Sequence, residues 1–470
     1  MTRVTMFHMS NLIILSNRGP YRFRSQSRQD ILEKCSGGLV SVLEPLMNQK
    51  GGFWLSAPCE SGKSFNSCSL STKYNWGTIS CDKETHKGFY DSYSNQLIWP
   101  IFHSMLNKSS TAAESSWGAY KRVNQTFAQA TCSRLNHNDL VWVHDYHLFL
   151  SPQLIRSETN KSAKIGFFLH IPFPSAELLK LISHAKDILH GLLGSDFIGF
   201  HTKDYQTNFL DSVQKLLGYA CDFETGTILA GGRQVKTKAL PIGIDLNPIQ
   251  RIVNSTNTQE RAEAFRNEIG TEKLVVGVDR LDYTKGILNR LQGFEQYLKQ
   301  NPDWVGKVSM IQLAVPTRTQ IDEYKTYKQQ VENQVQHINT QFGSKNYTPV
   351  DYRYQTMPFN DLIALYQAAD IALITPLRDG MNLVAKEYVA SKQNGGVLIL
   401  SKLAGAAAEL KEAILVNPYD TDSITRAIGE ALKMPAAKQQ HKMAKMQLTV
   451  QHNDMKNWAD RFLSELSHAE

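Results

Sequence analysis

The chain lacks the features that mark a membrane protein, a disulfide-rich secreted protein or a metal-binding protein. Its 470 residues contain no apolar run of membrane-spanning length. The six cysteines form no CxxC pair and no metal-ligand spacing, which favours reduced thiols in the cytoplasm. Residues 1–10 are polar and lack the apolar segment of a signal peptide. We therefore expect a cytoplasmic protein with no membrane partner and no metal site.

The charge of the chain also lacks a pronounced pattern. The formal net charge of +7 is spread along the sequence without a basic block, and no repeat or low-complexity segment is visible. Such a balance gives a mild attraction for small anions and does not recommend nucleic acid as a partner. A hydrophobic content of 42% and a charged content of 20% are ordinary for a globular protein. The length predicts roughly two to three domains.

Apolar strand-like runs alternate with helical patterns for almost the whole length. This alternation predicts an α/β protein with parallel sheets and helices on both faces. We expect strands at residues 12–16, 140–144, 165–170, 197–200, 238–242, 274–278, 308–315, 350–354, 371–374, 397–400 and 414–416. We expect helices at residues 115–135, 203–217, 256–269, 287–300, 319–342, 360–368 and 382–392. A Ser/Asn/Lys-rich stretch, residues 61–73, is typical of a surface loop.

The two halves of this pattern join near Pro241–Asn247, which predicts an N-terminal domain over residues 1–244 and a C-terminal domain over residues 245–452. Residues 453–470 form an amphipathic pattern, and such a helix can pack back onto the first domain. Ligands of open α/β sheets bind outside the carboxyl ends of the strands. We therefore expect the site in a deep cleft between two Rossmann-like domains.

The most informative segment is Thr375–Glu387, which follows the buried strand predicted at residues 371–374. Its loop contains Gly380 at the tight point, and a run of helix formers begins near Asn382. The start of a helix offers unpaired N–H groups and about half a positive charge, which suits a phosphate or a sugar oxyanion. The segment thus indicates an anion site at the start of a helix.

Two carboxylates of this segment are placed for sugar recognition. Asp379 lies where a carboxylate can accept hydrogen bonds from sugar hydroxyls, and Glu387 lies two turns along the helix, where it can reach a ribose. The alternative is an ordinary strand–helix turn in which Arg378 and Asp379 form a solvated pair. The segment alone does not decide between the two.

Three clusters of the first half also follow predicted strands. Gly37 and Gly38 let the backbone approach a phosphate, or they form a plain turn. Asp145 lies between two histidines and could clamp a sugar or bind a metal, but no third and fourth ligand shows a suitable spacing. His170 ends a strand before two prolines, and a buried histidine with satisfied hydrogen bonds is the alternative.

In the second half, one loop brings two cations together. Arg280 and Lys285 suit a diphosphate leaving group. The alternative is a solvated loop in which Asp279 and Asp282 pair with these cations. Arg318, after the next strand, could hold a second anion. Because all these groups follow strands, the pattern favours an enzyme that handles a nucleotide-linked sugar and a second anionic ligand.

These segments together resemble the trehalose-6-phosphate synthases of glycosyltransferase family 20, which have the two-domain GT-B fold. The resemblance covers about residues 12–420, nearly the whole chain. It is carried by VHDYHL (143–148), GFFLHIPFPS (166–175), IGFHT (198–202), DRLDYTKGI (279–287), TPLRDGMNLVAKEYV (375–389), LAGAAAEL (403–410) and LVNPYD (415–420).

The resemblance implies a role for each matching residue. It implies catalytic roles for His170, Asp145, Arg280, Lys285 and Asp379. It implies that UDP-glucose, the donor, binds to Gly37, Gly38, Arg280, Lys285, Asp379, Gly380, Met381, Asn382, Leu383, Val384 and Glu387. It implies that glucose 6-phosphate, the acceptor, binds to Arg18, Tyr90, Trp99, Asp145 and Arg318.

The resemblance further implies a retaining transfer that forms α,α-trehalose 6-phosphate and UDP without a cofactor or a metal. It implies a homo-oligomer (a dimer or a tetramer) and a separate trehalose-6-phosphate phosphatase in the pathway. The family usually has a second tryptophan shortly after Trp54, where this chain has Leu55–Ala57. Because this departure lies on the acceptor side, two alternatives stay open: a related transferase, such as one that joins ADP-glucose to glycerol 3-phosphate, and a catalytically silent sugar-nucleotide-binding module.

Overall fold

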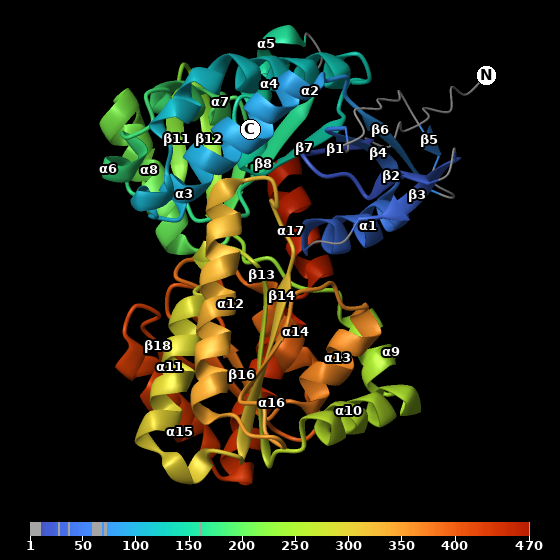
Figure 1. The fold of residues 1–470 in the computed structure, drawn as a ribbon. Coiled ribbons are helices and arrows are strands. Elements are labelled where there is room, and N and C mark those ends of the chain that lie inside the picture. The colour runs from blue at the N-terminus through green and yellow to red at the C-terminus, as the bar shows by residue number, and fades with distance from the viewer. Residues whose placement is uncertain are drawn as a thin grey trace, which may run out of the picture. The chain divides into compact units, whose positions relative to one another are not determined.

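The computed structural model describes residues 11–26, 29–35, 38–58, 68–69, 73–159 and 162–469. The backbone divides into two compact units, the first formed by Met1–Leu240 with Trp458–Glu470 and the second by Pro241–Asn457. Each unit has a sheet flanked by helices (Figure 1). The two-domain α/β fold expected from the sequence is therefore confirmed.

The first unit contains a ten-stranded sheet with the order β10-β11-β12-β9-β8-β7-β1-β4-β6-β5. Its strands are β1 (Leu12–Ser16), β4 (Gly52–Ser56), β5 (Cys68–Ser69), β6 (Tyr74–Thr78), β7 (Leu140–His144), β8 (Lys164–Phe168), β9 (Phe197–Phe200), β10 (Ala220–Asp222), β11 (Thr227–Ala230) and β12 (Arg233–Ala239). The central strands pair in parallel and are almost fully buried, as apolar runs covered on both faces should be.

Helices and a hairpin complete this unit. The hairpin pairs β2 (Tyr21–Gln26) with β3 (Gln29–Lys34). The helices are α1 (Gly38–Lys50), α2 (Lys83–His86), the π-helix η1 (Lys87–Ile98), α3 (Trp99–Phe102), α4 (Trp117–Cys132), α5 (Ser151–Glu158), α6 (Ala176–Leu179), α7 (Ala185–Leu192), α8 (Lys203–Leu217) and α17 (Met455–Ser467).

The sheet edge made by β10, β11 and β12 differs from the expectation. A strand was predicted over residues 238–242, but β12 spans Arg233–Ala239 and pairs antiparallel with β11. Leu240 still donates its N–H to the carbonyl of Phe200, at 2.7 Å. Pro241 has no N–H to donate, so the ladder cannot continue past this point.

The C-terminal helix α17 packs on the sheet of the first unit (Figure 1). Phe462 stacks on Trp142 of β7 with ring centroids 4.2 Å apart, and it also contacts Phe168 of β8. A Cβ atom at Gly166 would lie 2.8 Å from the Phe462 ring, so the missing side chain makes room for the helix. Burial of these aromatic rings holds the last helix on a sheet whose strands lie far away in sequence.

The second unit contains a parallel six-stranded sheet with the order β15-β14-β13-β16-β17-β18. Its strands are β13 (Lys273–Arg280), β14 (Val308–Val315), β15 (Val350–Arg353), β16 (Ile371–Ile374), β17 (Val397–Ser401) and β18 (Ile414–Val416). Its helices are α9 (Leu246–Val253), α10 (Thr256–Ile269), α11 (Ile287–Gln300), α12 (Asp322–Phe342), α13 (Phe359–Ala368), α14 (Leu383–Ser391), α15 (Thr421–Leu432) and α16 (Ala436–His452).

Strand order in the second unit brings two loops together. β13 and β16 are hydrogen-bonded neighbours, with Val275 opposite Ile371, although these two residues are 96 positions apart in the chain. Their carboxyl ends therefore lie at the same edge of the sheet. The loops that leave this edge, residues 281–286 and 375–382, carry five of the predicted donor residues: Lys285, Asp379, Gly380, Met381 and Asn382.

Candidate active site

The two loops of the second unit are fixed to each other by backbone contacts. The Leu377 N–H donates to the carbonyl of Thr284 at 2.7 Å. Gly286 has a φ of +63°, and a Cβ atom there would lie 2.3 Å from the carbonyl oxygen of Thr375. Only glycine fits this point without moving the neighbouring loop. These contacts hold the two loops against each other.

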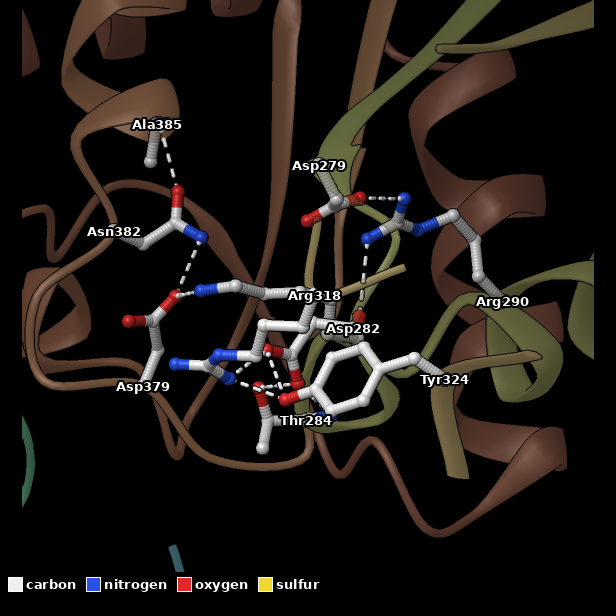
Figure 2. Close-up of polar contacts among 10 residues, drawn as sticks. Asp279, Asp282, Thr284, Arg290, Arg318, Tyr324, Asp379, Asn382 and Ala385 are labelled. Atoms are coloured by element: carbon white, nitrogen blue, oxygen red, sulfur yellow. Dashed lines mark hydrogen bonds and ion pairs between the residues drawn. The ribbon is translucent and has the colours of Figure 1, made fainter. Parts of the chain in front are cut away.

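Lys285 and Asp379 form an ion pair across these loops (Figure 2). The Lys285 Nζ lies 2.5 Å from the Asp379 Oδ2, and the two side chains are only 11% and 13% exposed. Asn382 donates from its Nδ2 to the same Asp379 oxygen at 3.0 Å. The predicted catalytic residues Lys285 and Asp379 therefore lie together.

Asn382 also begins helix α14. Its Oδ1 accepts the N–H of Ala385 at 3.1 Å, and its backbone is left-handed, with a φ of +84°. Asparagine tolerates this conformation better than most residues and is a favoured N-cap. The helix start predicted from the sequence is therefore present, and it faces the Lys285–Asp379 pair.

Four other predicted donor residues lie around this helix start. Met381 is buried, and its carbonyl accepts the N–H of Ala406 at 2.8 Å. Leu383 and Val384 form the partly exposed first turn of α14. The carbonyl of Gly380 lies 2.0 Å from the position that a Cβ atom would take at Gly405. The loop therefore packs tightly against the segment that follows β17.

Arg318 is held by a buried acidic residue. Its Nη1 lies 3.0 Å from the Asp282 Oδ2, and both side chains are almost fully buried. Tyr324, on the first turn of α12, donates its hydroxyl to the same oxygen at 3.1 Å and also contacts Arg318. Burial opposes ionisation of Asp282, but the charges of Arg318 and Arg280 outweigh it and lower the pKa of this carboxyl. Sequence reasoning did not identify Tyr324, because a tyrosine on a helix carries no signal of its own.

A second buried pair lies below the loop that follows β13. Arg290 of α11 contacts Asp279, and both side chains are essentially inaccessible to solvent. Arg290 also donates from Nη1 to Gln312 at 2.8 Å and from Nε to Thr375 at 3.2 Å. Burial raises the pKa of Asp279 despite the nearby Arg290. The pair ties β13, β14 and the loop after β16 to one helix.

Glu387 lies on α14 about one turn after the start of the helix, where the sequence predicts two turns. The Tyr366 hydroxyl donates to its Oε2 at 3.3 Å. Burial raises the pKa of this carboxyl to about 7, and the hydrogen bond from Tyr366 opposes the shift. Glu387 therefore changes charge near neutral pH, which an exposed glutamate would not do.

In the first unit, Arg18 and Tyr90 lie together. The Arg18 Nη2 donates to the Tyr90 hydroxyl at 3.2 Å. The Tyr90 ring stacks on His147, with centroids 5.7 Å apart and planes 10° apart. Tyr90 belongs to the π-helix η1, a rare form that is frequent at functional sites. Two predicted acceptor residues, 72 positions apart in sequence, thus meet.

Two further aromatic residues of the first unit are buried: Trp99, a predicted acceptor residue, and Trp76. Trp99 is 4% exposed and packs against His103 and Tyr146, with centroids 4.1 and 5.6 Å away. Trp76, which sequence reasoning missed, donates its Nε1 to Ser56 at 3.0 Å. A Cβ atom at Gly19 would lie 2.6 Å from that same nitrogen, so the loop after β1 packs directly on the indole.

Asp145 and His170 also lie together in the first unit. Asp145 has a φ of +74°, and its Oδ1 accepts the backbone N–H of His170 at 3.3 Å. The His170 Nε2 lies 3.0 Å from the Nδ1 of His144. Burial lowers the pKa of His170 to about 3, so its imidazole is neutral at physiological pH. Asp145 and His170 are therefore fixed with respect to each other.

Of the two predicted glycines, Gly38 begins helix α1, while Gly37 lies outside the described residues. Within the described ranges, no group of three histidine, cysteine or acidic residues could hold a metal ion. No helix in the same ranges is long and apolar enough to cross a membrane. Much of the predicted surface loop 61–73 also lies outside the described residues.

Comparison with known proteins covers the chain nearly end to end. An alpha,alpha-trehalose-phosphate synthase (UDP-forming) of Candida albicans is 36% identical over 465 residues, which cover 97% of each protein. A bifunctional trehalose-6-phosphate synthase/phosphatase of Thermoproteus tenax is 43% identical over 394 residues, or 83% of this chain. The match spans only 53% of the Thermoproteus protein.

Solved structures agree with these relatives. A UDP-forming synthase from Burkholderia xenovorans in complex with glucose-6-phosphate has a TM-score of 0.90 at 32% identity, and the match covers 97% of this chain and 100% of that one. An E. coli structure bound with UDP-2-fluoro glucose has a TM-score of 0.88 at 31% identity, covering 98% and 99%. The profile of glycosyltransferase family 20 matches residues 10–468. The chain belongs to glycosyltransferase family 20.

Proposed function

We propose that this family 20 protein is a retaining glucosyltransferase that makes α,α-trehalose 6-phosphate and UDP from UDP-glucose and glucose 6-phosphate. The observation that carries the proposal is the Lys285–Asp379–Asn382 cluster at the start of α14. It places a cation and a carboxylate at the start of a helix, a combination that suits a nucleotide diphosphate and its sugar. UDP-forming relatives match across the chain.

On the donor side, Arg280, Lys285 and the α14 amides stabilise the negative charge that grows on the leaving diphosphate. Such fixed electrostatic groups usually supply the largest share of catalysis. Asp379 and the backbone at residues 380–384 bind the glucose and the phosphates, and Glu387 accepts a hydrogen bond from a ribose hydroxyl. Gly37 and Gly38 let the backbone of the first unit approach the phosphates.

On the acceptor side, Arg18 and Arg318 bind the phosphate of glucose 6-phosphate, while Tyr90, Trp99 and Asp145 bind its sugar. This assignment makes the first unit mainly acceptor-binding and the second unit mainly nucleotide-sugar-binding. Arg318 is the acceptor residue that belongs to the second unit, and Gly37, Gly38 and His170 are the donor residues that belong to the first. Arg318 is held on Asp282 and Tyr324, and this contact presets its guanidinium for an incoming phosphate. His170 contacts the reacting donor sugar.

The transfer proceeds on one face of the sugar. The acceptor hydroxyl attacks the anomeric carbon on the side from which UDP leaves, and the departing phosphate takes the hydroxyl proton. The bond to UDP breaks, the new glycosidic bond forms, and the configuration is retained. The protein's contribution is then mainly positioning and charge stabilisation.

The test is UDP and ADP release by purified protein, with the product identified by mass and NMR. UDP-glucose and ADP-glucose are each paired with glucose 6-phosphate and glycerol 3-phosphate. We expect trehalose 6-phosphate to form fastest from UDP-glucose. Turnover only with glycerol 3-phosphate would show that glucose 6-phosphate is not the acceptor. Turnover only with ADP-glucose would show that UDP-glucose is not the donor. Donor binding without any turnover would support the silent module.

We further propose that the reaction needs no metal or other cofactor, so that an EDTA-treated sample keeps its activity. The cytoplasmic location, the dimer or tetramer and the separate trehalose-6-phosphate phosphatase stay predictions. Light scattering measures the oligomeric state directly. Release of inorganic phosphate from trehalose 6-phosphate by this chain alone would contradict the need for a separate phosphatase.

A further inference from the structure

His144 is a buried histidine to which the mechanism above gives no role. It is the last residue of β7 and is fully inaccessible to solvent. β7 pairs in parallel with β8, so the end of β7 lies beside the segment that follows β8 and carries His170. The result is a direct contact between two imidazole rings, with the His144 Nδ1 3.0 Å from the His170 Nε2.

A hydrogen bond between these nitrogens constrains the protons of both rings. Burial lowers the pKa of His144 well below its ordinary value and that of His170 to about 3, so both rings are neutral. A neutral imidazole has one N–H donor and one bare acceptor nitrogen. One ring must therefore donate from the contacting nitrogen while the other accepts.

The surroundings of His144 indicate which ring donates. Its other nitrogen, Nε2, is buried and has no hydrogen-bond partner among the described residues. The ring packs beside Trp142 at 4.6 Å and Trp458 of α17 at 6.5 Å. A buried N–H without a partner is rarer in proteins than a buried acceptor without one. The bare nitrogen is then Nε2, and the proton lies on Nδ1, facing His170.

The position of this proton determines the tautomer of His170. If the His144 Nδ1–H donates, the His170 Nε2 must accept, and the His170 proton must lie on Nδ1. We propose that His144 is a positioning residue that holds His170 in the Nδ1–H form, so that Nδ1 donates a hydrogen bond to a hydroxyl oxygen of the donor sugar. The sugar contact rests on the proposed function, but the tautomer itself does not.

Nitrogen-15 NMR of histidine-labelled protein without substrate tests the tautomer directly. We expect the protonated nitrogen of His170 to be Nδ1. His144→Phe keeps an aromatic ring in the apolar surroundings but removes the donor, so the Nε2–H form of His170 should gain population. His144→Asn keeps a donor near the position of Nδ1 and should preserve the wild-type tautomer. Trp458→Phe changes the packing without touching the hydrogen bond and should also leave it unchanged.

Kinetics with UDP-glucose and glucose 6-phosphate then links the tautomer to turnover. We expect kcat/KM to fall about tenfold in His144→Phe, the size expected for one lost hydrogen bond, and to recover in His144→Asn. An Nε2–H form of His170 in the wild-type spectrum would overturn the proposal, even if neither variant folds. So would equal losses in His144→Phe and Trp458→Phe. An inactive wild-type protein with the expected spectrum would instead refute the proposed function alone.

Discussion

The two units of the protein use different physical means to hold their predicted site residues. In the second unit, the loops after β13 and β16 are fixed by ion pairs: Lys285 with Asp379, Asp282 with Arg318 and Asp279 with Arg290. In the first unit, the contacts join mainly aromatic and imidazole rings, such as Tyr90 on His147 and His144 on His170.

The difference follows the chemistry proposed for each half. A diphosphate that gains negative charge needs fixed cations, and cations at the end of a buried sheet need carboxylate partners. Apart from its phosphate, which is assigned to Arg18 and Arg318, the acceptor presents hydroxyl groups and apolar ring faces, which aromatic and polar groups match. Loss of a partner should therefore cost more in the second unit than in the first.

The largest expected effect is on stability. Arg290→Met leaves Asp279 buried without its cation, and we expect the free energy of unfolding of the protein to fall by about 3–5 kcal/mol. Arg261→Met removes an arginine that is 48% exposed and paired with Asp361, and it should cost about 1 kcal/mol or less. Urea denaturation of both variants measures the difference. If the two variants lost similar amounts of unfolding free energy, burial would not explain the cost of breaking an ion pair.

The next effect is on catalysis. Lys285→Ala removes a cation from the diphosphate site, and we expect kcat/KM to fall by on the order of 10²–10³. Lys299→Ala is a matched control, because Lys299 lies on α11, is 47% exposed and pairs with Glu295. UDP release under initial-rate conditions gives both values. If the kcat/KM of Lys285→Ala stayed within a few-fold of the wild-type value, Lys285 would have no role in the mechanism.

A smaller effect is expected on the acceptor side. Tyr90→Phe keeps the ring stacked on His147 but removes the hydroxyl that accepts from Arg18. One net hydrogen bond is worth about 0.5–1.5 kcal/mol, so the KM for glucose 6-phosphate should rise roughly 2- to 10-fold. Tyr347→Phe, which loses a hydroxyl bonded to the Val308 carbonyl, should leave this KM unchanged. A change in the KM for UDP-glucose instead would contradict the assignment of Tyr90 to the acceptor.

The smallest effect is a pH dependence of donor binding. Glu387, with a pKa raised by burial to about 7, is a carboxylate above that pH and neutral below it. A carboxylate accepts stronger hydrogen bonds than a neutral carboxyl, so UDP should bind more weakly as the pH falls through 7. Tyr366→Phe removes a hydrogen bond that lowers this pKa, so the midpoint should move to higher pH. Calorimetric titration of UDP across pH 5.5–8.5 measures this dependence. If the UDP affinity of Glu387→Gln changed with pH as that of the wild type does, the account would be contradicted.

The sequence was most informative where chemistry is local. Asp379, Asn382 and the start of α14 lie within a few residues of one another, and strand-end loops of parallel sheets have known positions. The partners of these residues were not predictable, because they come from distant segments. Tyr324 bonds to Asp282, 42 positions away in the sequence, and Gln312 bonds to Arg290, 22 positions away.

The same limit applies to the first unit. The π-helix η1 has no periodicity that would distinguish it from an α-helix, and the contact between His144 and His170 depends on the pairing of β7 with β8. The end of β12 was misplaced because Pro241 stops the ladder earlier than the apolar pattern suggests. Local motifs thus indicated which residues matter, and tertiary packing determined how each is held.

The most direct test of the division between the two halves is calorimetric titration of UDP and of glucose 6-phosphate, separately, into the wild type, Lys285→Ala and Arg18→Ala. The account predicts that Lys285→Ala loses affinity for UDP and keeps its affinity for glucose 6-phosphate, while Arg18→Ala does the reverse. Loss of UDP binding in Arg18→Ala with unchanged glucose 6-phosphate binding would contradict it.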